Sequence, residues 1–287
     1  MIKLLALDLD GTLLNSRGEI SLENIQAIQK AEEKGVLVTI ATGRRFRDAL
    51  PVANQLKLNA PVICHNGALI KYADTLEPVA VSIVPQKTVR EILRVGREFG
   101  GDALVSADPH GKGVLLYDRI SAENVPLQKY IAWGKRLHGA EAEEAVHHVE
   151  NLEAICGEVE TVHVSFSGSC APMAHLEMIL RDELQSAATV LTTVYPRLDF
   201  TLIDILPSDA SKGIGVEKLA LINKLSPENV MAIGDNFNDL EMLEYAGTAV
   251  VMGNASPELL ERAEFQTTLS NDENGVALAI EKFILDV

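Results

Sequence analysis

Short runs of consecutive apolar residues alternate with segments of helical spacing in the first quarter of the chain. The runs are residues 2–7, 36–41 and 62–64. Such runs are typical of strands that are buried on both faces. Between the first two runs, Ser21 is a candidate N-cap and Gly35 a candidate helix stop, and a second helix is expected over 46–56. The order strand, helix, strand, helix, strand predicts an α/β fold with a doubly wound parallel sheet.

The middle of the chain has a different pattern. Residues 159–166 alternate with period two, with Val162, Val164 and Phe166 on one side, which predicts a half-exposed strand of an antiparallel sheet. Further helices are expected from Pro85, over about 122–137 and over 173–184, and further strands over 103–106, 114–117 and 189–195. We therefore expect residues 84–196 to form an inserted α/β domain.

The pattern of buried strands returns after Pro196. Strands are expected over 200–206, 230–233 and 248–252, with helices over 212–222, 240–245 and 275–284. This alternation again indicates a doubly wound sheet. The predicted organisation is therefore one core domain made of residues 1–83 and 197–287, interrupted by the insertion.

Charge and cysteine content limit the possible partners and location. The formal net charge of the 287 residues is −16, which disfavours binding to nucleic acid or to an anionic membrane. The cysteines number three and lack metal-ligand spacing, so reduced thiols in a cytoplasmic protein are expected. No apolar stretch approaches the ~18 residues of a membrane span, and the N-terminus reads as a strand rather than a signal peptide. The oligomeric state stays open.

Four polar clusters lie where predicted strands end or the following helix begins. They are DLDGT at 8–12, TGR at 42–44, SKG at 211–213 and GDNFND at 234–239. In a doubly wound sheet, the carboxyl ends of the strands line one crevice, where ligands bind. The clusters can therefore converge on one site although they span most of the chain.

DLDGT suggests covalent chemistry on a phosphoryl group. Asp8 ends a buried strand, and a carboxylate there is a competent nucleophile that would form an aspartyl phosphate. Gly11 predicts a sharp turn that brings Asp10 to the same site, where it could protonate the leaving oxygen and later deprotonate water. Thr12 completes the cluster as a candidate phosphate-binding or substrate-binding residue.

The remaining clusters predict a metal site and a phosphate site. Asp235, Asn238 and Asp239 offer hard oxygen ligands which, together with those of DLDGT, indicate Mg²⁺. A hydroxyl, backbone N–H groups at a helix start and a fixed ammonium suit a phosphate. The candidates for that role are Thr42, Gly43, Arg44, Asn66 and Lys212.

These motifs, in this order, resemble those of the haloacid dehalogenase-like phosphatases. The insertion and NGA at 66–68 are similar to the Cof-type sugar phosphatases, which have a Rossmann-like core and a large α/β cap. The resemblance implies that Asp8 is nucleophile and magnesium ligand, and that Asp10 is general acid/base and binds magnesium through its carbonyl. It also implies that Thr42 and Lys212 hold the phosphoryl group, and that Asp235 ligates magnesium with support from Asn238 and Asp239.

The resemblance implies a magnesium-dependent phosphatase for small phosphorylated metabolites such as sugar phosphates, with the cap closing over the site. A dehalogenase has no leaving oxygen to protonate and would not need Asp10. A phosphomutase of the phosphomannomutase type does need an acid there and is the enzymatic alternative. A phospho-accepting regulatory domain is the non-enzyme alternative, although it would be less than half as long. A DxD glycosyltransferase would leave GDNFND unexplained.

Overall fold

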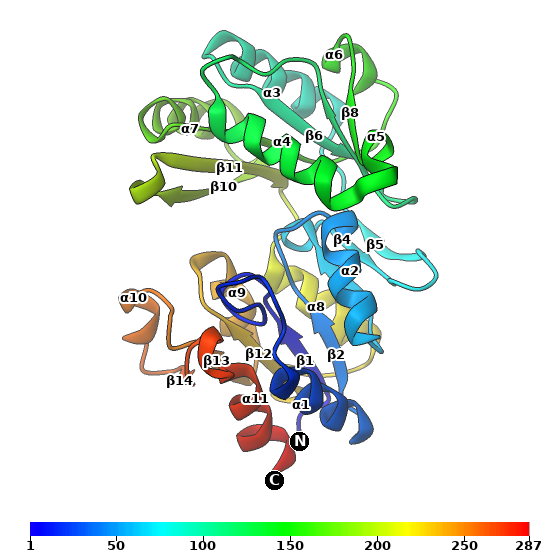
Figure 1. Cartoon of the computed structure of the whole chain (residues 1–287), viewed down its shortest axis with the longest axis vertical. Helices are drawn as coiled ribbons and strands as arrows, with labels where there is room; N and C mark the ends of the chain where they lie inside the picture. The colour runs from blue at the N-terminus through cyan, green and yellow to red at the C-terminus, as the bar shows by residue number, and fades with distance from the viewer. Residues whose placement is uncertain (287) are drawn as a thin grey trace. The chain divides into compact units, whose positions relative to one another are not determined.

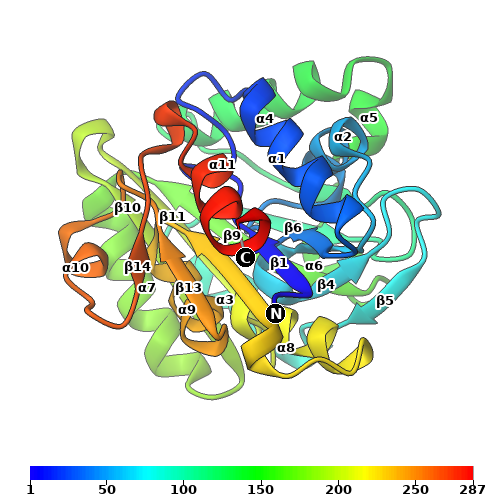
Figure 2. The same cartoon turned by 90° about the horizontal axis from the view of Figure 1, so that it is seen from below.

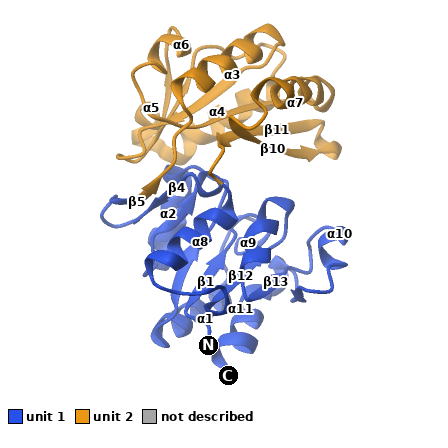
Figure 3. Ribbon diagram, turned by 180° about the vertical axis from the view of Figure 1, so that it is seen from behind, with its two compact units in different colours: residues 1–79, 211–287 blue, residues 80–210 orange. Residues whose placement is uncertain are grey.

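A computed structural model describes residues 1–286, which divide into two compact units. Unit 1 contains Met1–Val79 and the chain from Ser211 onward, and unit 2 contains Ala80–Ala210 (Figure 3). No helix within residues 1–286 combines the length and the apolar character that crossing a membrane requires.

Unit 1 contains most of the parallel pairing. Its strands are β1 (Leu4–Leu7), β2 (Leu37–Ile40), β3 (Val62–Cys64), β4 (Leu69–Lys71), β12 (Val230–Gly234), β13 (Thr248–Val251) and β14 (Gln266–Thr267), while β5 (Pro78–Val81) crosses into unit 2. Its helices are α1 (Leu22–Glu33), α2 (Phe46–Leu56), α8 (Lys212–Ile222), α9 (Leu240–Tyr245), α10 (Pro257–Leu260) and α11 (Gly275–Ile280).

The main sheet of unit 1 is parallel, in the order β14-β13-β12-β1-β2. Helices α1 and α11 lie on one face, and α8 and α9 lie on the other (Figures 1 and 2). The predicted N-cap of α1 is confirmed, because the Ser21 hydroxyl accepts the amide of Asn24 at 3.2 Å. The predicted doubly wound sheet is confirmed as well, except that β3 pairs antiparallel with β4 in a separate three-stranded sheet and meets the end of β2 through one isolated parallel bridge, Ala41 to Ile63.

Unit 2 is built on a six-stranded sheet in the order β10-β11-β9-β6-β7-β8. Its strands are β6 (Ala103–Ala107), β7 (Val114–Tyr117), β8 (Val146–His148), β9 (Thr161–Gly168), β10 (Ala188–Tyr195) and β11 (Phe200–Pro207). Its helices are α3 (Gln86–Glu98), α4 (Val125–His138), α5 (Ala142–Ala145), α6 (Leu152–Ile155) and α7 (Cys170–Leu184). Most pairs are antiparallel, whereas β7 and β8 are parallel.

Alternation along the strands of unit 2 gives its sheet two separate apolar faces. In β6, Val105 belongs to a core with the apolar residues of α3 and α7, whereas Leu104 belongs to a core with those of α4. In β7, Leu116 belongs to the core with α3 and α7, and Leu115 belongs to the core with α4. Successive side chains of a strand point to opposite faces, so one strand can serve both cores.

Two sequence-based expectations about this region are wrong. Residues 200–206 were expected in the doubly wound sheet, but β11 pairs antiparallel with β9 and β10, so unit 2 ends at Ala210 rather than at residue 196. A buried apolar run does not reveal which sheet it joins. The polar side of β9 is buried rather than exposed, and His163 Nε2 lies 2.8 Å from Asp204 Oδ1 of β11.

Two helical glycines of unit 2 should respond in opposite ways to alanine. A Cβ on Gly96 of α3 would lie 2.3 Å from the Phe166 ring, whereas one on Gly134 of α4 would lie 3.4 Å from Val146. We expect Gly96→Ala to destabilise unit 2 by ~1–3 kcal/mol through overpacking. Gly134→Ala should be neutral or stabilise it by up to ~1 kcal/mol through helix propensity. Urea unfolding followed by circular dichroism measures both, and stabilisation by Gly96→Ala would contradict the packing.

Candidate active site

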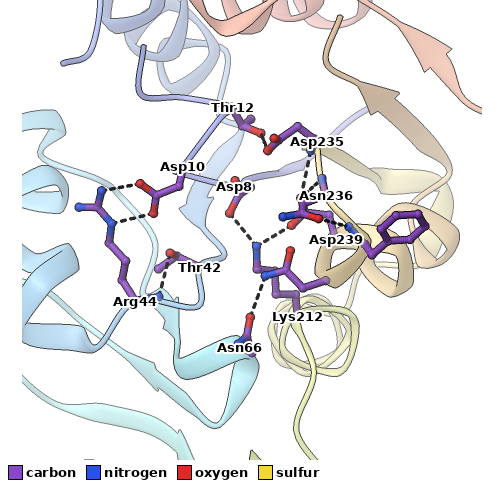
Figure 4. A network of polar contacts seen from close by, with 12 residues as sticks. Asp8, Asp10, Thr12, Thr42, Arg44, Asn66, Lys212, Asp235, Asn236 and Asp239 are labelled. Atoms are coloured by element: carbon purple, nitrogen blue, oxygen red, sulfur yellow. Dashed lines mark hydrogen bonds and ion pairs between the residues drawn. The ribbon is translucent and has the colours of Figure 1, made fainter. Parts of the chain in front are cut away.

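The four polar clusters come together at one end of the main sheet of unit 1 (Figure 4). The strand register explains why. Leu7 of β1 pairs with Ile40 of β2 on one side and with Ile233 of β12 on the other. The three strands are therefore in register, and the residues that follow them lie at the same edge of the sheet. Helix α8 brings Lys212 to the same place, with the Ser211 hydroxyl accepting the amide of Ile214 at 3.1 Å.

Lys212 is the centre of the buried part of the site. Its Nζ lies 2.6 Å from Oδ1 of Asp8 and 2.6 Å from Oδ1 of Asp239, and all three residues are at most 4% exposed. The other oxygen of Asp239 accepts the amides of Asp235 and Asn236, at 3.0 Å each. Because both its oxygens are occupied, Asp239 orients Lys212 and the turn after β12.

The site holds more buried negative charge than Lys212 can neutralise. Carboxylate oxygens of Asp8, Asp235 and Asp239 lie within 4.8 Å of one another. Burial, assisted by Asp239 and Asp235, raises the pKa of Asp8 well above its ordinary value although Lys212 opposes the shift. Burial and Asp239 likewise raise the pKa of Asp235 to about 6. Burial lowers the pKa of Lys212, but Asp239 and Asp8 outweigh it and raise that pKa.

This charge imbalance fits a divalent cation. Lys212 donates to Oδ1 of Asp8 and the Thr12 hydroxyl donates to Oδ1 of Asp235, so the ammonium of Lys212 is shared among three clustered carboxylates. Hard carboxylate oxygens of this kind suit Mg²⁺, which needs few protein ligands. Asp239 is less suited to direct coordination because both its oxygens already accept hydrogen bonds. Asp8 and Asp235 therefore form the pair that best fits a metal.

Gly11 and Thr12 join the first motif to the fourth. Gly11 has φ +86°, and a Cβ there would lie 2.3 Å from Oδ2 of Asp235, so both the conformation and the space require glycine. The hydroxyl of Thr12 donates to Oδ1 of Asp235 at 2.9 Å. Thr12 thus contacts a carboxylate of the site, and its predicted contact with phosphate or substrate stays a prediction.

Asp10 lies at the exposed edge of the site and is paired with Arg44. Nε and Nη2 of Arg44 donate to the two carboxylate oxygens of Asp10, at 2.8 and 2.6 Å (Figure 4). The Asp10 side chain is 61% exposed and that of Arg44 is 25% exposed. Burial lowers the pKa of Arg44, but the negative charges of Asp10, Asp48 and Asp8 outweigh this effect, so the pKa is raised overall. The charge of Asp8 therefore acts on Arg44 although the ion pair is with Asp10.

The predicted phosphate-binding residues surround the start of α2 and the loop after β3. Thr42 is buried and its hydroxyl accepts the amide of Arg44 at 3.1 Å. Asn66 has φ 49°, and its Oδ1 accepts a hydrogen bond from the Asn238 amide group at 3.1 Å. A Cβ on Gly43 would lie 3.1 Å from that same oxygen. Asn66 therefore connects the TGR and GDNFND motifs.

Sequence reasoning missed Asn254, which supports the DLDGT loop. Its amide group donates to the Gly11 carbonyl at 2.8 Å, and its Oδ1 accepts the amide of Asn271 at 2.9 Å. The signal was available, since Asn254 follows the buried apolar strand β13 as the other clusters follow theirs. Asn254 is the one polar side chain of the segment MGN, so it was less visible than the four polar side chains of GDNFND.

The sequence and the fold of this chain are similar to those of known hydrolases. The family model for haloacid dehalogenase-like hydrolases matches residues 5–280. The stress response protein YhaX of Bacillus subtilis is 31% identical, covering 98% of this chain and 93% of its own. The 5-amino-6-(5-phospho-D-ribitylamino)uracil phosphatase YwtE of the same organism is 30% identical, covering 99% and 98%. The structure of a haloacid dehalogenase-like hydrolase from Bacteroides thetaiotaomicron has TM-score 0.81 and 25% identity, covering 99% and 100%.

The charge imbalance predicts that neutralising Asp235 stabilises the metal-free protein. The pKa of Asp235 is about 6 when folded and near 3.8 ordinarily, so its charge opposes folding fully above pH ~6 and not below pH ~4. In chelator at pH 7, Asp235→Asn should raise the free energy of unfolding by on the order of 1 kcal/mol, discounted for partial exposure. Denaturant unfolding at pH 7 and pH 4 tests this. A gain of equal size at both pH values would contradict it.

Proposed function

The chain belongs to the haloacid dehalogenase-like hydrolase family, and on that basis we propose that it is a magnesium-dependent phosphatase acting through an aspartyl-phosphate intermediate. The observation that carries the proposal is the placement of Asp8. Its carboxylate lies at the end of β1, held by a buried ammonium and beside a second carboxylate that suits a metal. That is what a nucleophile toward an anionic phosphate ester requires.

The first step forms the covalent intermediate. An oxygen of Asp8 attacks phosphorus, the bond from phosphorus to the ester oxygen breaks, and the leaving oxygen takes a proton from Asp10. Lys212 offsets the charge that accumulates between Asp8 and the incoming phosphoryl group. In the second step, Asp10 takes a proton from water, the water oxygen attacks phosphorus, and inorganic phosphate leaves as Asp8 is regenerated.

The phosphoryl oxygens would be held by groups at two helix starts. The Thr42 hydroxyl and the Gly43 amide precede α2, and Lys212 begins α8. Thr12, Arg44 and Asn66 are the further candidates for contact with the substrate. Hydroxyl, amide and ammonium donors are the groups that bind phosphate at such positions.

Magnesium would be held by Asp8 and Asp235, with the carbonyl of Asp10 as a further ligand, while Asn238 and Asp239 support the loop. When bound, magnesium neutralises the phosphoryl charge and orients the group for in-line attack. The excess of carboxylates over Lys212 supports a cation here. Asp239 would act through its hydrogen bonds to Lys212 and to the turn.

The substrate class we propose is a small phosphomonoester, such as a sugar phosphate. YwtE is named as a phosphatase of 5-amino-6-(5-phospho-D-ribitylamino)uracil, a small phosphomonoester with a phosphorylated ribityl chain. The net charge of −16 disfavours nucleic acid as a substrate. The same relative is named a phosphatase, so transfer to water is favoured over the isomerisation carried out by a phosphomutase.

A panel of phosphate esters should identify the activity. Hexose phosphates, the phosphorylated ribitylaminouracil and pyridoxal phosphate should release inorganic phosphate, whereas a phosphopeptide and a 5′-phosphorylated oligonucleotide should be poor substrates. Release should require Mg²⁺. Calcium should inhibit, because its looser geometry lets Asp8 bind the metal through both oxygens. Equal rates on the large and small substrates, or full activity in excess chelator, would refute the proposal.

Two carboxamide variants test the roles of the DLDGT carboxylates. Asp8→Asn should abolish turnover and leave the fold intact, because it removes the attacking charge with almost no change in shape. Asp10→Asn should reduce kcat by ~10²–10⁴-fold through lost proton transfer. Asp74→Asn, at an exposed turn, is the matched control and should keep normal activity. If Asp8→Asn retains more than about a tenth of kcat, the covalent mechanism is wrong.

A further inference from the structure

Arg44 occupies both oxygens of the carboxylate that is proposed to move protons. The two hydrogen bonds, at 2.8 and 2.6 Å, form a bidentate fork on Asp10. Each carboxylate oxygen keeps a second lone pair, but turning the carboxyl group away from Arg44 toward a leaving group would stretch or break this fork. The arrangement therefore describes Asp10 in a held position, which we call the Arg44 latch.

The main chain of Arg44 is fixed by hydrogen bonds, and its side chain lies at the partly exposed edge of the site. The Arg44 amide donates to the Thr42 hydroxyl at 3.1 Å, and its carbonyl accepts the amide of His65 at 2.9 Å. The ion pair itself lies at the edge of the site, with the Asp10 side chain 61% exposed. The guanidinium thus extends from the TGR segment, next to the groups proposed to hold phosphate.

We propose that the phosphate group of the substrate competes with Asp10 for the Arg44 guanidinium, so that substrate binding itself releases Asp10 for proton transfer. The inference rests on the proposed phosphatase function and adds a positioning role for Arg44. A guanidinium fork matches phosphate oxygens as well as it matches a carboxylate. A phosphate ester carries more charge than a carboxylate, so the exchange runs toward the substrate.

The energetics of the latch permit such an exchange. A partly exposed ion pair favours its paired state over the separated state by no more than about fivefold. A dianionic ligand that binds Arg44 can overcome this preference. A guanidinium stays protonated with or without a partner, so Arg44 keeps its charge when it leaves Asp10. The neighbouring Arg45 cannot substitute, because it is buried in an ion pair with Asp48 at 2.7 Å.

A double-mutant cycle on phosphate binding tests the latch without using turnover. Calorimetry with inorganic phosphate and Mg²⁺ would give Kd for the unaltered protein, Asp10→Ala, Arg44→Ala and the double variant. Asp10→Ala should tighten binding about fivefold, because Arg44 no longer has to leave a partner. Arg44→Ala should weaken binding by roughly tenfold through the loss of a charge-assisted fork. In the Arg44→Ala background, removing Asp10 should change Kd by less than about twofold.

Controls separate the latch from simpler explanations. Arg17→Ala removes an exposed arginine paired with Glu19 and should leave Kd unchanged. Thermal unfolding of each variant verifies that the fold is kept. If Asp10→Ala tightens binding equally with and without Arg44, charge repulsion accounts for the effect and the latch is overturned, even while phosphate release by the enzyme stands. If the unaltered protein binds no phosphate, the latch is overturned, and the ester panel decides separately whether the proposed function stands.

Discussion

The ammonium of Lys212, buried between Asp8 and Asp239, is the interaction on which the rest of the site depends. Removing three charged groups from water costs several kcal/mol for each ion unless close partners compensate. Here the compensation consists of two 2.6 Å contacts and two backbone amides on the far oxygen of Asp239. Such an arrangement tolerates little displacement, so it fixes the positions of β1, α8 and the turn after β12 together.

The close approach of these segments depends on residues without side chains. Gly67 has φ +93°, and a Cβ there would lie 1.9 Å from the Ser211 carbonyl, so only glycine lets the Asn66 loop reach the start of α8. Gly11 similarly lets the DLDGT loop reach Asp235. The glycines of the motifs thus set distances between segments, whereas the acids and Lys212 supply the charges.

The sequence predicted unit 1 well because two signals agree there: the buried apolar runs that mark strands and the polar residues that follow them. Buried apolar runs gave β1 and β2, and the polar residues after them gave Asp8 and Thr42, which lie together because parallel strands end at one edge. Asp239 was predicted among the metal ligands, yet its contacts with Lys212 could not be read from a linear pattern. In unit 2 the burial of His163 beside Asp204 escaped prediction, because polar residues on alternate positions normally indicate exposure.

The two cations of the site, Lys212 and Arg44, differ in burial, and this difference matches the carboxylates that they contact. Lys212 is 2% exposed and tied to two buried carboxylates, so separating it from Asp8 would leave an uncompensated charge away from water. The Arg44 side chain is 25% exposed and its partner Asp10 is 61% exposed, so water can solvate either group during a separation. A nucleophile has to be held still, whereas a group that gives and takes protons has to change partners within one catalytic cycle. In the proposed mechanism, the buried cation is therefore paired with the carboxylate that would attack, and the partly exposed cation with the carboxylate that would exchange protons.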